Sequence, residues 1–340
     1  DGSPTVMEGF PKAMLANSTF KNFRNVTLAD LNDDGADEVI IGVNDKLYAY
    51  DSNGLLWEKD IIGTALYPPS VADMDGDGDL EIVLATGGLT SGRLYVVDHT
   101  STDLPNFPLN FDDHWMIAAP ALSDLDEDGQ LEIIVGERTP PIGRLQIIKL
   151  DGTSFSNFPV EIDGTPALTP SVADIDNDGE KDIVIASTSS LYAFDLKGVI
   201  KIGFPIQKTG LKYSYQSPIL IDLDQDGTKE IVGAGHGDAP EYYIRNSVGN
   251  YKEGWAIPIP ENTWSFNTPT VIDWNNETII FMSRPVGSDN DEDMLYAWNS
   301  RGELLSNFPI IKAGGLEGII SVADIDNDLE PELVFGSNLY

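Results

Sequence analysis

The chain has 340 residues, of which 56 are acidic and only 20 are lysine or arginine, so its formal net charge is −36. Nucleic acid is an unsuitable partner for such a surface, because binding it requires lysine and arginine to neutralise phosphates. No apolar run is long enough to span a membrane. The chain contains no cysteine, so bound metal, and not a disulfide, is the expected staple of a secreted fold.

The first predicted element is an acidic loop that recurs about every 50 residues along the chain. Its complete form, residues 174–182, reads Asp-Ile-Asp-Asn-Asp-Gly-Glu-Lys-Asp, with carboxylates at positions 1, 3, 5 and 9 and glycine at position 6. Odd positions can turn their oxygens towards one hard cation, and glycine permits the sharp turn. The first aspartate of each copy is Asp30, Asp73, Asp124, Asp174, Asp222, Asp273 or Asp324.

The residues beside the loop indicate strands and not the helices of an EF-hand. An EF-hand needs a bidentate glutamate at position 12, where this chain has Ile185. The flanks, residues 171–173 and 183–186, are short and rich in β-branched residues. The pattern therefore predicts a calcium loop that joins two strands.

Six of the seven loops are predicted to bind Ca²⁺ through the side chains at positions 1, 3, 5 and 9 and the backbone carbonyl at position 7. The alternative is a set of Asx-turns without metal, which the mutual repulsion of four converging carboxylates disfavours. In chain order, the expected ligands are Asp30, Asn32, Asp34, Ala36, Glu38, Asp73, Asp75, Asp77, Asp79, Glu81, Asp124, Asp126, Asp128, Gln130, Glu132, Asp174, Asp176, Asp178, Glu180, Asp182, Asp222, Asp224, Asp226, Thr228, Glu230, Asp324, Asp326, Asp328, Glu330 and Glu332.

Two copies depart from the pattern. The copy at Asp273 lacks the glycine and has too few residues before the next strand, so we expect an ordinary turn without metal. The last copy has Leu329 at position 6. A residue other than glycine at positive φ costs on the order of 1 kcal/mol, so we expect a weaker site at Asp324.

The remaining elements of each repeat are further short strands. A third strand, such as residues 47–51 or 191–195, precedes a glycine turn and a fourth strand that is expected to end in Phe-Pro. Four short strands per repeat are typical of a β-propeller blade. Although the length alone would suggest two domains, the repeats predict one all-β domain over residues 1–340. It is a seven-bladed β-propeller of four-stranded antiparallel blades, with repeats beginning near residues 26, 69, 120, 170, 218, 269 and 320.

The two ends of the sequence suggest how the last blade is completed. The final repeat stops at the start of a third strand, whereas residues 1–11 match the fourth-strand segment 151–159. We expect the N-terminal segment around Gly9-Phe10-Pro11 to supply the missing outer strand, which would remove exposed sheet edges. The alternative is that residues beyond Tyr340 complete this blade.

The repeated loop between two strands resembles the FG-GAP/VCBS repeat family, which includes the propeller of integrin α-subunits and many secreted bacterial proteins. The resemblance covers essentially the whole chain. It implies a calcium-binding propeller on the outside of a bacterial or archaeal cell, secreted or at the surface. It is much less specific for function, because one fold hosts many functions.

Strand direction separates two faces of the predicted propeller. The calcium loops and the glycine turns, with His99, fall on one face. Loops between second and third strands (138–141, 235–240 and 283–293) and the connections between blades fall on the other. This second face varies between repeats, as recognition surfaces do. The alternative for its aromatic rings is packing beneath their own loops. We expect a monomeric domain that binds a protein or glycan there, through Tyr67, Trp115, Tyr213, Tyr215, His236 and Trp264.

Three functions remain open. The first is a non-catalytic binding or adhesion module of a larger extracellular protein, and the second is a lectin. The third is a polysaccharide lyase, since one pectin-degrading family has similar repeats but eight blades. The sequence contains no nucleophile elbow, zinc-protease motif or phosphate loop. A patch at Asp112, Asp113 and His114 could serve acid–base chemistry, but a solvated turn is the simpler interpretation, so a non-enzyme is favoured.

Overall fold

The computed structural model describes residues 26–88, 91–112, 114–116, 118–139, 141–166, 168–213, 216–259, 267–284, 288–316, 319–326 and 328–336. Every regular element in these ranges is a β-strand, and the strands form seven antiparallel sheets, one for each predicted repeat. The all-β prediction is therefore confirmed. The chain divides into two compact units, one reaching Thr139 and including Arg144–Pro159, the other comprising Pro140–Gly143 and the chain from Val160 onwards.

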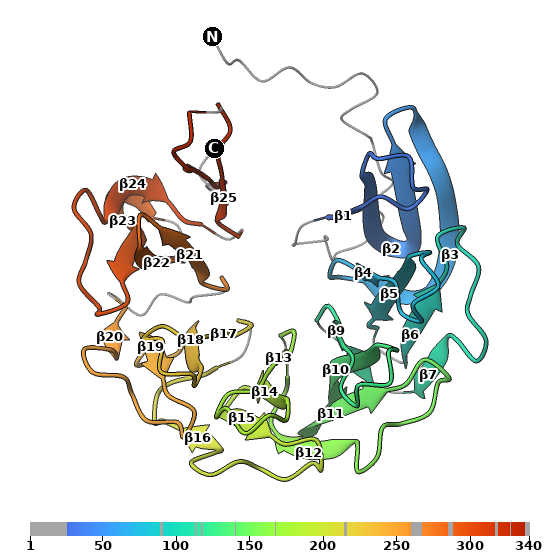
Figure 1. Cartoon of the computed structure of the whole chain (residues 1–340), viewed down its shortest axis with the longest axis horizontal. Helices are drawn as coiled ribbons and strands as arrows, with labels where there is room; N and C mark the ends of the chain where they lie inside the picture. The colour runs from blue at the N-terminus through green and yellow to red at the C-terminus, as the bar shows by residue number, and fades with distance from the viewer. Residues whose placement is uncertain are drawn as a thin grey trace. The chain divides into compact units, whose positions relative to one another are not determined.

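The first unit contains three sheets (Figure 1). One has the order β1-β2-β3, with β1 (Thr27–Ala29), β2 (Glu38–Asp51) and β3 (Gly54–Ala65). The next has the order β4-β5-β6-β7, with β4 (Ser70–Ala72), β5 (Glu81–Thr86), β6 (Ser91–Val97) and β7 (Leu109–Asp112). The third pairs β8 (Trp115–Met116) and β9 (Ala121–Ser123) with β10 (Glu132–Thr139), which is followed by β11 (Ile142–Ile148).

From Val160 onwards, the second unit contains β12 (Val160–Asp163) and the sheets β13-β14-β15-β16, β17-β18-β19-β20, β21-β22-β23-β24 and β25-β26 (Figure 1). The bounds are β13 (Ser171–Ala173), β14 (Asp182–Ala186), β15 (Ser190–Phe194), β16 (Ile206–Gln207), β17 (Ile219–Ile221), β18 (Glu230–Ala234), β19 (Glu241–Arg245), β20 (Ile257–Pro258), β21 (Thr270–Trp274), β22 (Glu277–Ser283), β23 (Ser288–Asn299), β24 (Ile310–Gly314), β25 (Ser321–Ala323) and β26 (Glu332–Val334).

In the second to fifth repeats, the strand after the acidic loop is buried on both of its faces. In β5, Ile82 and Leu84 lie in one hydrophobic cluster while Val83 and Ala85 lie in another. This follows from the two-residue period of a strand, which turns successive side chains to opposite faces of the sheet. A continuous apolar run such as this is the mark of a strand that has neighbours on both sides.

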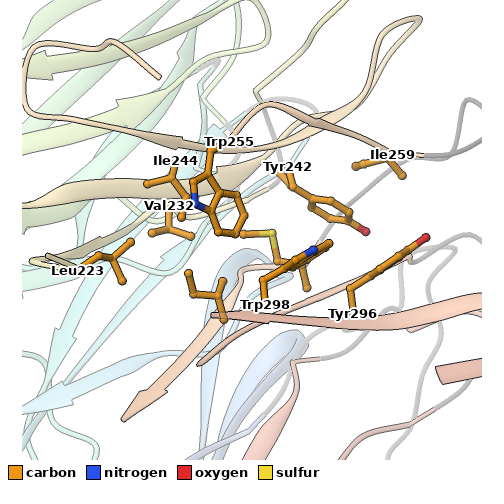
Figure 2. Packing of buried hydrophobic residues seen from close by; sticks show 11 residues of the cluster. Leu223, Val232, Tyr242, Ile244, Trp255, Ile259, Tyr296 and Trp298 are labelled. Atoms are coloured by element: carbon orange, nitrogen blue, oxygen red, sulfur yellow. The ribbon is translucent and has the colours of Figure 1, made fainter. Parts of the chain in front are cut away.

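Aromatic rings fill the space between the sheets of β18 and β22. Tyr242, Trp255 and Trp298 are each at most 4% exposed (Figure 2). The ring centroids of Tyr242 and Trp298 lie 5.2 Å apart, and those of Tyr296 and Trp298 lie 5.1 Å apart in a stacked arrangement. Rings of this size contribute most of the apolar area in such a core.

Neighbouring sheets within a unit are also joined by hydroxyl groups of the first strand. Ser70 Oγ donates to the carbonyl of Pro120 at 2.6 Å, and Ser171 Oγ donates to that of Pro218 at 2.5 Å. Thr27 and Thr270 make the same kind of bond to Pro69 and Ile320. The first strands of successive sheets are thereby held at a fixed spacing.

Three strand predictions were wrong. The fourth strands follow the Phe-Pro pairs and do not end in them: β7, β12, β16 and β24 each start at the residue immediately after the proline. Proline has no N–H for a ladder bond, so pairing starts beyond it. The second and third strands expected in the first repeat are one element, β2, with Asn44 at φ 54° midway.

The third error concerns two predicted loops. Residues 288–293 belong to β23 and pair with β24, and Arg138 and Thr139 belong to β10. Cross-strand pairing overrides the low strand propensity of aspartate and asparagine in the first case. The predicted closure by residues 1–11 lies outside the described residues and stays a prediction.

Candidate calcium loops and candidate ligand face

The acidic loops share one backbone arrangement around the first aspartate. In the fourth loop, Asp174 accepts the N–H of Asp178 at 3.1 Å and the N–H of Gly179 at 2.9 Å. The position-6 glycines that allow this turn have φ between 86° and 99°. The same two donors contact the first aspartate in the loops that begin at Asp30, Asp73, Asp124, Asp222 and Asp324.

The position-9 carboxylate fixes the other end of each loop. Glu81 starts β5, is 5% exposed, and accepts the N–H of Met74 at 2.9 Å. The equivalent bonds join Leu31 to Glu38, Leu125 to Glu132, Ile175 to Asp182, Leu223 to Glu230 and Ile325 to Glu332. The strand that follows the loop thus carries its last carboxylate into a buried position in the first five loops, whereas Glu332 of the last loop is partly exposed.

Burial has an electrostatic consequence at these carboxylates. Desolvation raises the pKa of Glu81, and the negative charges of Asp75 and Asp77 add to the increase, although the Met74 N–H opposes it. Burial likewise raises the pKa of Glu38, Glu132 and Asp182. A cation held among these groups would stabilise their ionised form.

Carboxylate oxygens converge in five loops, each of which has three oxygens within 4.8 Å of one another. Calcium binds oxygens at roughly 2.3–2.6 Å, so ligands around one ion lie up to about 5 Å apart, and the spacing fits calcium. Asp176 Oδ1 is also buried without a hydrogen-bond partner. The groups are Asp73, Asp75 and Glu81; Asp124, Asp126 and Glu132; Asp174, Asp176 and Asp178; Asp222, Asp224 and Glu230; and Asp324, Asp326 and Glu332.

The first loop differs because position 3 is an amide. Asn32 Oδ1 accepts the N–H of Asp34 at 3.0 Å, while Asn32 Nδ2 donates to Glu38 Oε1 at 3.2 Å. An amide oxygen can ligate calcium. This loop therefore stays a predicted site with fewer carboxylates than the others.

The two atypical repeats have the backbones that their sequences predicted. Asn275 and Asn276, at φ 49° and 63°, form a tight turn between β21 and β22. Thr278 Oγ1 donates to Asp273 at 2.6 Å. In the last loop, Leu329 lies at φ 71°, in the conformation that glycine adopts in the other loops. Weaker calcium binding there stays a prediction.

Three loops contain a lysine ammonium that sequence reasoning missed. Lys201 Nζ lies 2.8 Å from carboxylate oxygens of both Asp176 and Asp182. Lys149 and Lys252 contact the third and fifth loops in the same way. Burial opposes the charged form of Lys201, but its hydrogen bonds to the two aspartates raise its pKa. Because the lysines lie 17 to 22 residues after the last carboxylate of their loops, no local motif signals them.

On the other predicted face, the structure describes four of the six expected ligand residues. Tyr67 and Trp115 are half-buried, and Tyr215 and Trp264 lie outside the described residues. Tyr213 is fully buried against Tyr243, and burial raises its pKa to about 12. His236 is 3% exposed. Both buried rings pack in the core, as the alternative interpretation of this set expected.

The histidines take different environments. His99, which was predicted on the face of the acidic loops, has its Nδ1 3.8 Å from Asp79 of the second loop. His114 is partly exposed and its Nδ1 contacts the carboxylate of Glu137, which is buried and also accepts a bond from Gln146. The predicted acid–base patch around His114 missed Glu137, because that residue reaches it from β10.

A cavity of about 330 Å³ lies beside the loop between β18 and β19. Its lining includes Lys208, Asp238, Pro240, Glu241 and Pro258. The buried carboxylate of Glu241 contacts both Lys208 Nζ and the hydroxyl of Tyr251. The cavity combines a charged wall with an aliphatic wall, an arrangement that suits a small polar ligand.

Comparisons with known proteins agree with the repeats and the sheets. Residues 73–135 and 124–185 each match the family described as FG-GAP-like repeat. No curated protein matches the sequence. Within the described residues, no helix has the length and apolar run needed to cross a membrane.

Similar solved structures share the fold at low sequence identity. Two structures of BBS1N in complex with ARL6DN, one soaked with mercury and one with lead, have TM-scores of 0.56 and 0.52 at 14% identity. Each match covers 91% of this chain. The matches cover 88% of the BBS1N chain in the mercury-soaked structure and 87% in the lead-soaked one. A quinohemoprotein alcohol dehydrogenase from Pseudomonas putida HK5 has a TM-score of 0.50 at 11% identity, covering 88% of this chain and 61% of its own. These relatives are β-propeller proteins, and the likeness shows that fold.

Proposed function

We propose that this chain, a β-propeller protein built of FG-GAP-like repeats, is a calcium-binding module that binds a partner and catalyses no reaction. The observation that carries the proposal is the convergence of three carboxylates in each of five loops. Calcium would hold these loops on one face, while a protein or glycan binds the opposite face.

Charge favours a bound cation over simple Asx-turns. Two carboxylates about 4 Å apart repel each other by roughly 4 kcal/mol at an effective dielectric constant of 20. A divalent ion replaces this repulsion by attraction. Calcium is the preferred ion because the donors are all oxygen and three carboxylates converge in each loop.

The expected affinity supports an extracellular location. Calcium sites of extracellular modules bind with dissociation constants of about 10⁻⁴–10⁻³ M, which the calcium concentration of the cytosol would leave empty. A fold with no cysteine and a net charge of −36 would gain stability from such ions.

Two observations support a role in binding. BBS1N, a similar propeller, was solved in complex with ARL6DN, so a protein partner is the first candidate. A glycan is the second, and the cavity beside Lys208 favours it. Its ammonium can donate to a hydroxyl group, and the Pro240 and Pro258 rings can pack against the apolar face of a sugar.

Metal counting tests the central part of the proposal. The chain is brought to equilibrium by dialysis against millimolar calcium at high ionic strength, and bound calcium per chain is measured by mass spectrometry as the excess over the calcium of the surrounding buffer. Asp73→Asn with Glu81→Gln should remove one ion. Asp98→Asn, in a turn outside the loops, is the matched control. Equal calcium content in parent and loop variant would contradict calcium binding at this loop.

A glycan array, probed with and without calcium, tests the second candidate ligand. Binding that Lys208→Met weakens at least about tenfold, roughly 1.4 kcal/mol, would support the cavity as the glycan site. Lys197→Met, which removes an exposed lysine elsewhere, should leave such binding unchanged. Binding that survives Lys208→Met would place the glycan away from this cavity.

A further inference from the structure

Three consecutive acidic loops each contain the ammonium group of a lysine. Lys149 Nζ lies 2.6 Å from Asp126, Lys201 Nζ lies 2.8 Å from Asp176, and Lys252 Nζ lies 2.5 Å from Asp224. Each ammonium therefore contacts the carboxylate at position 3. Each also approaches the buried carboxylate at position 9, at distances of 3.8, 2.8 and 3.0 Å to Glu132, Asp182 and Glu230.

The lysine ammonium group occupies the space between the carboxylates in which a calcium ion would bind. A calcium ion shared by positions 3 and 9 would lie roughly 2.3–2.6 Å from the same oxygens. The side chain of Lys201 is only 12% exposed, so it is enclosed by the loop and does not merely reach over it. Two cations cannot share this space, because each would lose the carboxylates that the other contacts.

Different chain positions deliver these ammonium groups. Lys201 and Lys252 each lie three residues before the aromatic residue that ends their turn, Phe204 and Trp255. In the third repeat that position is Phe155, and the ammonium comes instead from Lys149, which lies 5.3 Å above the Phe155 ring. The third repeat therefore uses a lysine at a different position, and that lysine also places its ammonium group in the loop.

The second loop has no such group. The position equivalent to Lys201 is Leu104, and the position equivalent to Lys149 is Asp98. Among the described residues, the nearest basic group in an ion pair is His99, which contacts Asp79 and not Asp73, Asp75 or Glu81. The loops therefore fall into at least two classes that share one backbone.

We propose that Lys149, Lys201 and Lys252 are built-in counter-ions that keep the third, fourth and fifth loops folded without calcium, and that calcium must displace them to bind. This inference rests on the proposed calcium binding. It implies that the need for calcium is concentrated at loops without a lysine, such as the one at Asp73. The lysine loops would bind calcium more weakly and respond to higher concentrations.

Lys201→Met tests the inference, because methionine keeps the length and apolar character of the side chain while removing the charge. Melting temperature is measured in EDTA and in millimolar calcium, and calcium affinity is measured by competition with a fluorescent chelator. Lys201→Met should melt lower than the parent in EDTA, recover in calcium, and bind calcium at this loop about tenfold more tightly. Lys252→Met should behave alike, and Lys201→Arg should retain the parent's stability in EDTA.

Lys197→Met is the matched control, since Lys197 is 69% exposed and its one ion pair within the described part of the chain is with Glu180, at 3.5 Å. The inference is overturned if Lys201→Met and Lys197→Met melt alike in EDTA, or if Lys201→Met melts lower in EDTA without recovering in calcium. Asp73→Asn separates this failure from failure of the proposed function. If calcium stabilises the parent and Asp73→Asn reduces that gain, calcium binding stands whatever the lysine variants do.

Discussion

At the level of single residues, each acidic loop depends on groups that lie within nine positions of one another. Asp174 accepts two backbone N–H groups of its own loop, and Asp182 accepts the N–H of Ile175. Because these partners are local, the sequence was sufficient to predict which carboxylates converge in five of the loops and the turn conformation of Leu329. It could not predict Lys201, whose approach depends on how the turn after β15 packs on the loop.

Position 6 provides a reciprocal test of loop strain. Gly78 has φ +99° and no atom within 4 Å of an added Cβ, so Gly78→Ala would strain the backbone without a clash. Its free energy of unfolding in calcium should fall by about 1 kcal/mol. Leu329→Gly should instead tighten calcium binding at the Asp324 loop. Urea unfolding measures the stability of Gly78→Ala, and calcium titration measures the affinity of Leu329→Gly. An unchanged stability of Gly78→Ala or a weaker calcium affinity of Leu329→Gly would contradict this account.

His236 makes stability depend on pH. Burial, with a smaller effect from Lys212, lowers its pKa from 6.5 to about 4. Between these values the unfolded chain takes up a proton that the folded chain does not, so stability falls as pH decreases from 6.5 to 4. The full loss is about 3 kcal/mol. It is complete below pH 4 and absent above 6.5.

His236→Gln should remove this contribution, so the difference in unfolding free energy between parent and variant should change between pH 7 and pH 4.5. Urea unfolding at both pH values measures it. Carboxylates titrate in the same range, but they are common to parent and variant and cancel in the difference. Parallel pH profiles would show that His236 is not buried in its neutral form.

At the level of elements, the strands after the loops hold neighbouring sheets together. Strands such as the one containing Ile82-Val83-Leu84 bury side chains on both faces, and their continuous apolar sequence made them predictable. Strand ends were harder to predict. The extent of β23 and the start of the fourth strands depend on hydrogen bonding to a partner strand, which local propensity does not contain.

The hydroxyl bonds between first strands should contribute measurably to stability. Ser171→Ala removes the bond to the Pro218 carbonyl and leaves a partly buried acceptor without it. Unfolding should be easier by about 1 kcal/mol. Ser156→Ala, at an exposed position, should change little. Equal unfolding free energies for the two variants would mean that the hydroxyl bond is not maintained in solution.

At the level of the whole molecule, acidic residues outnumber basic ones by 56 to 20. Many of the acidic residues lie in the loops, and at least three loops contain a lysine partner. The negative charge of the loops is thus concentrated where a cation can neutralise it, and in three loops a lysine ammonium group does so. Repeat number and fold follow from the sequence, whereas the ligand does not, because recognition depends on how loops from different repeats meet.

Thermal melting in EDTA and then in millimolar calcium, with calcium counted on the same sample, tests the central claim most directly. Each site contributes about 1.4 kcal/mol when calcium is ten times its dissociation constant, so several sites should together raise the melting temperature by several degrees. Calcium should restore the loss caused by EDTA, with bound ions found on the chain. An unchanged melting temperature and no bound calcium would contradict calcium binding and the extracellular role inferred from it.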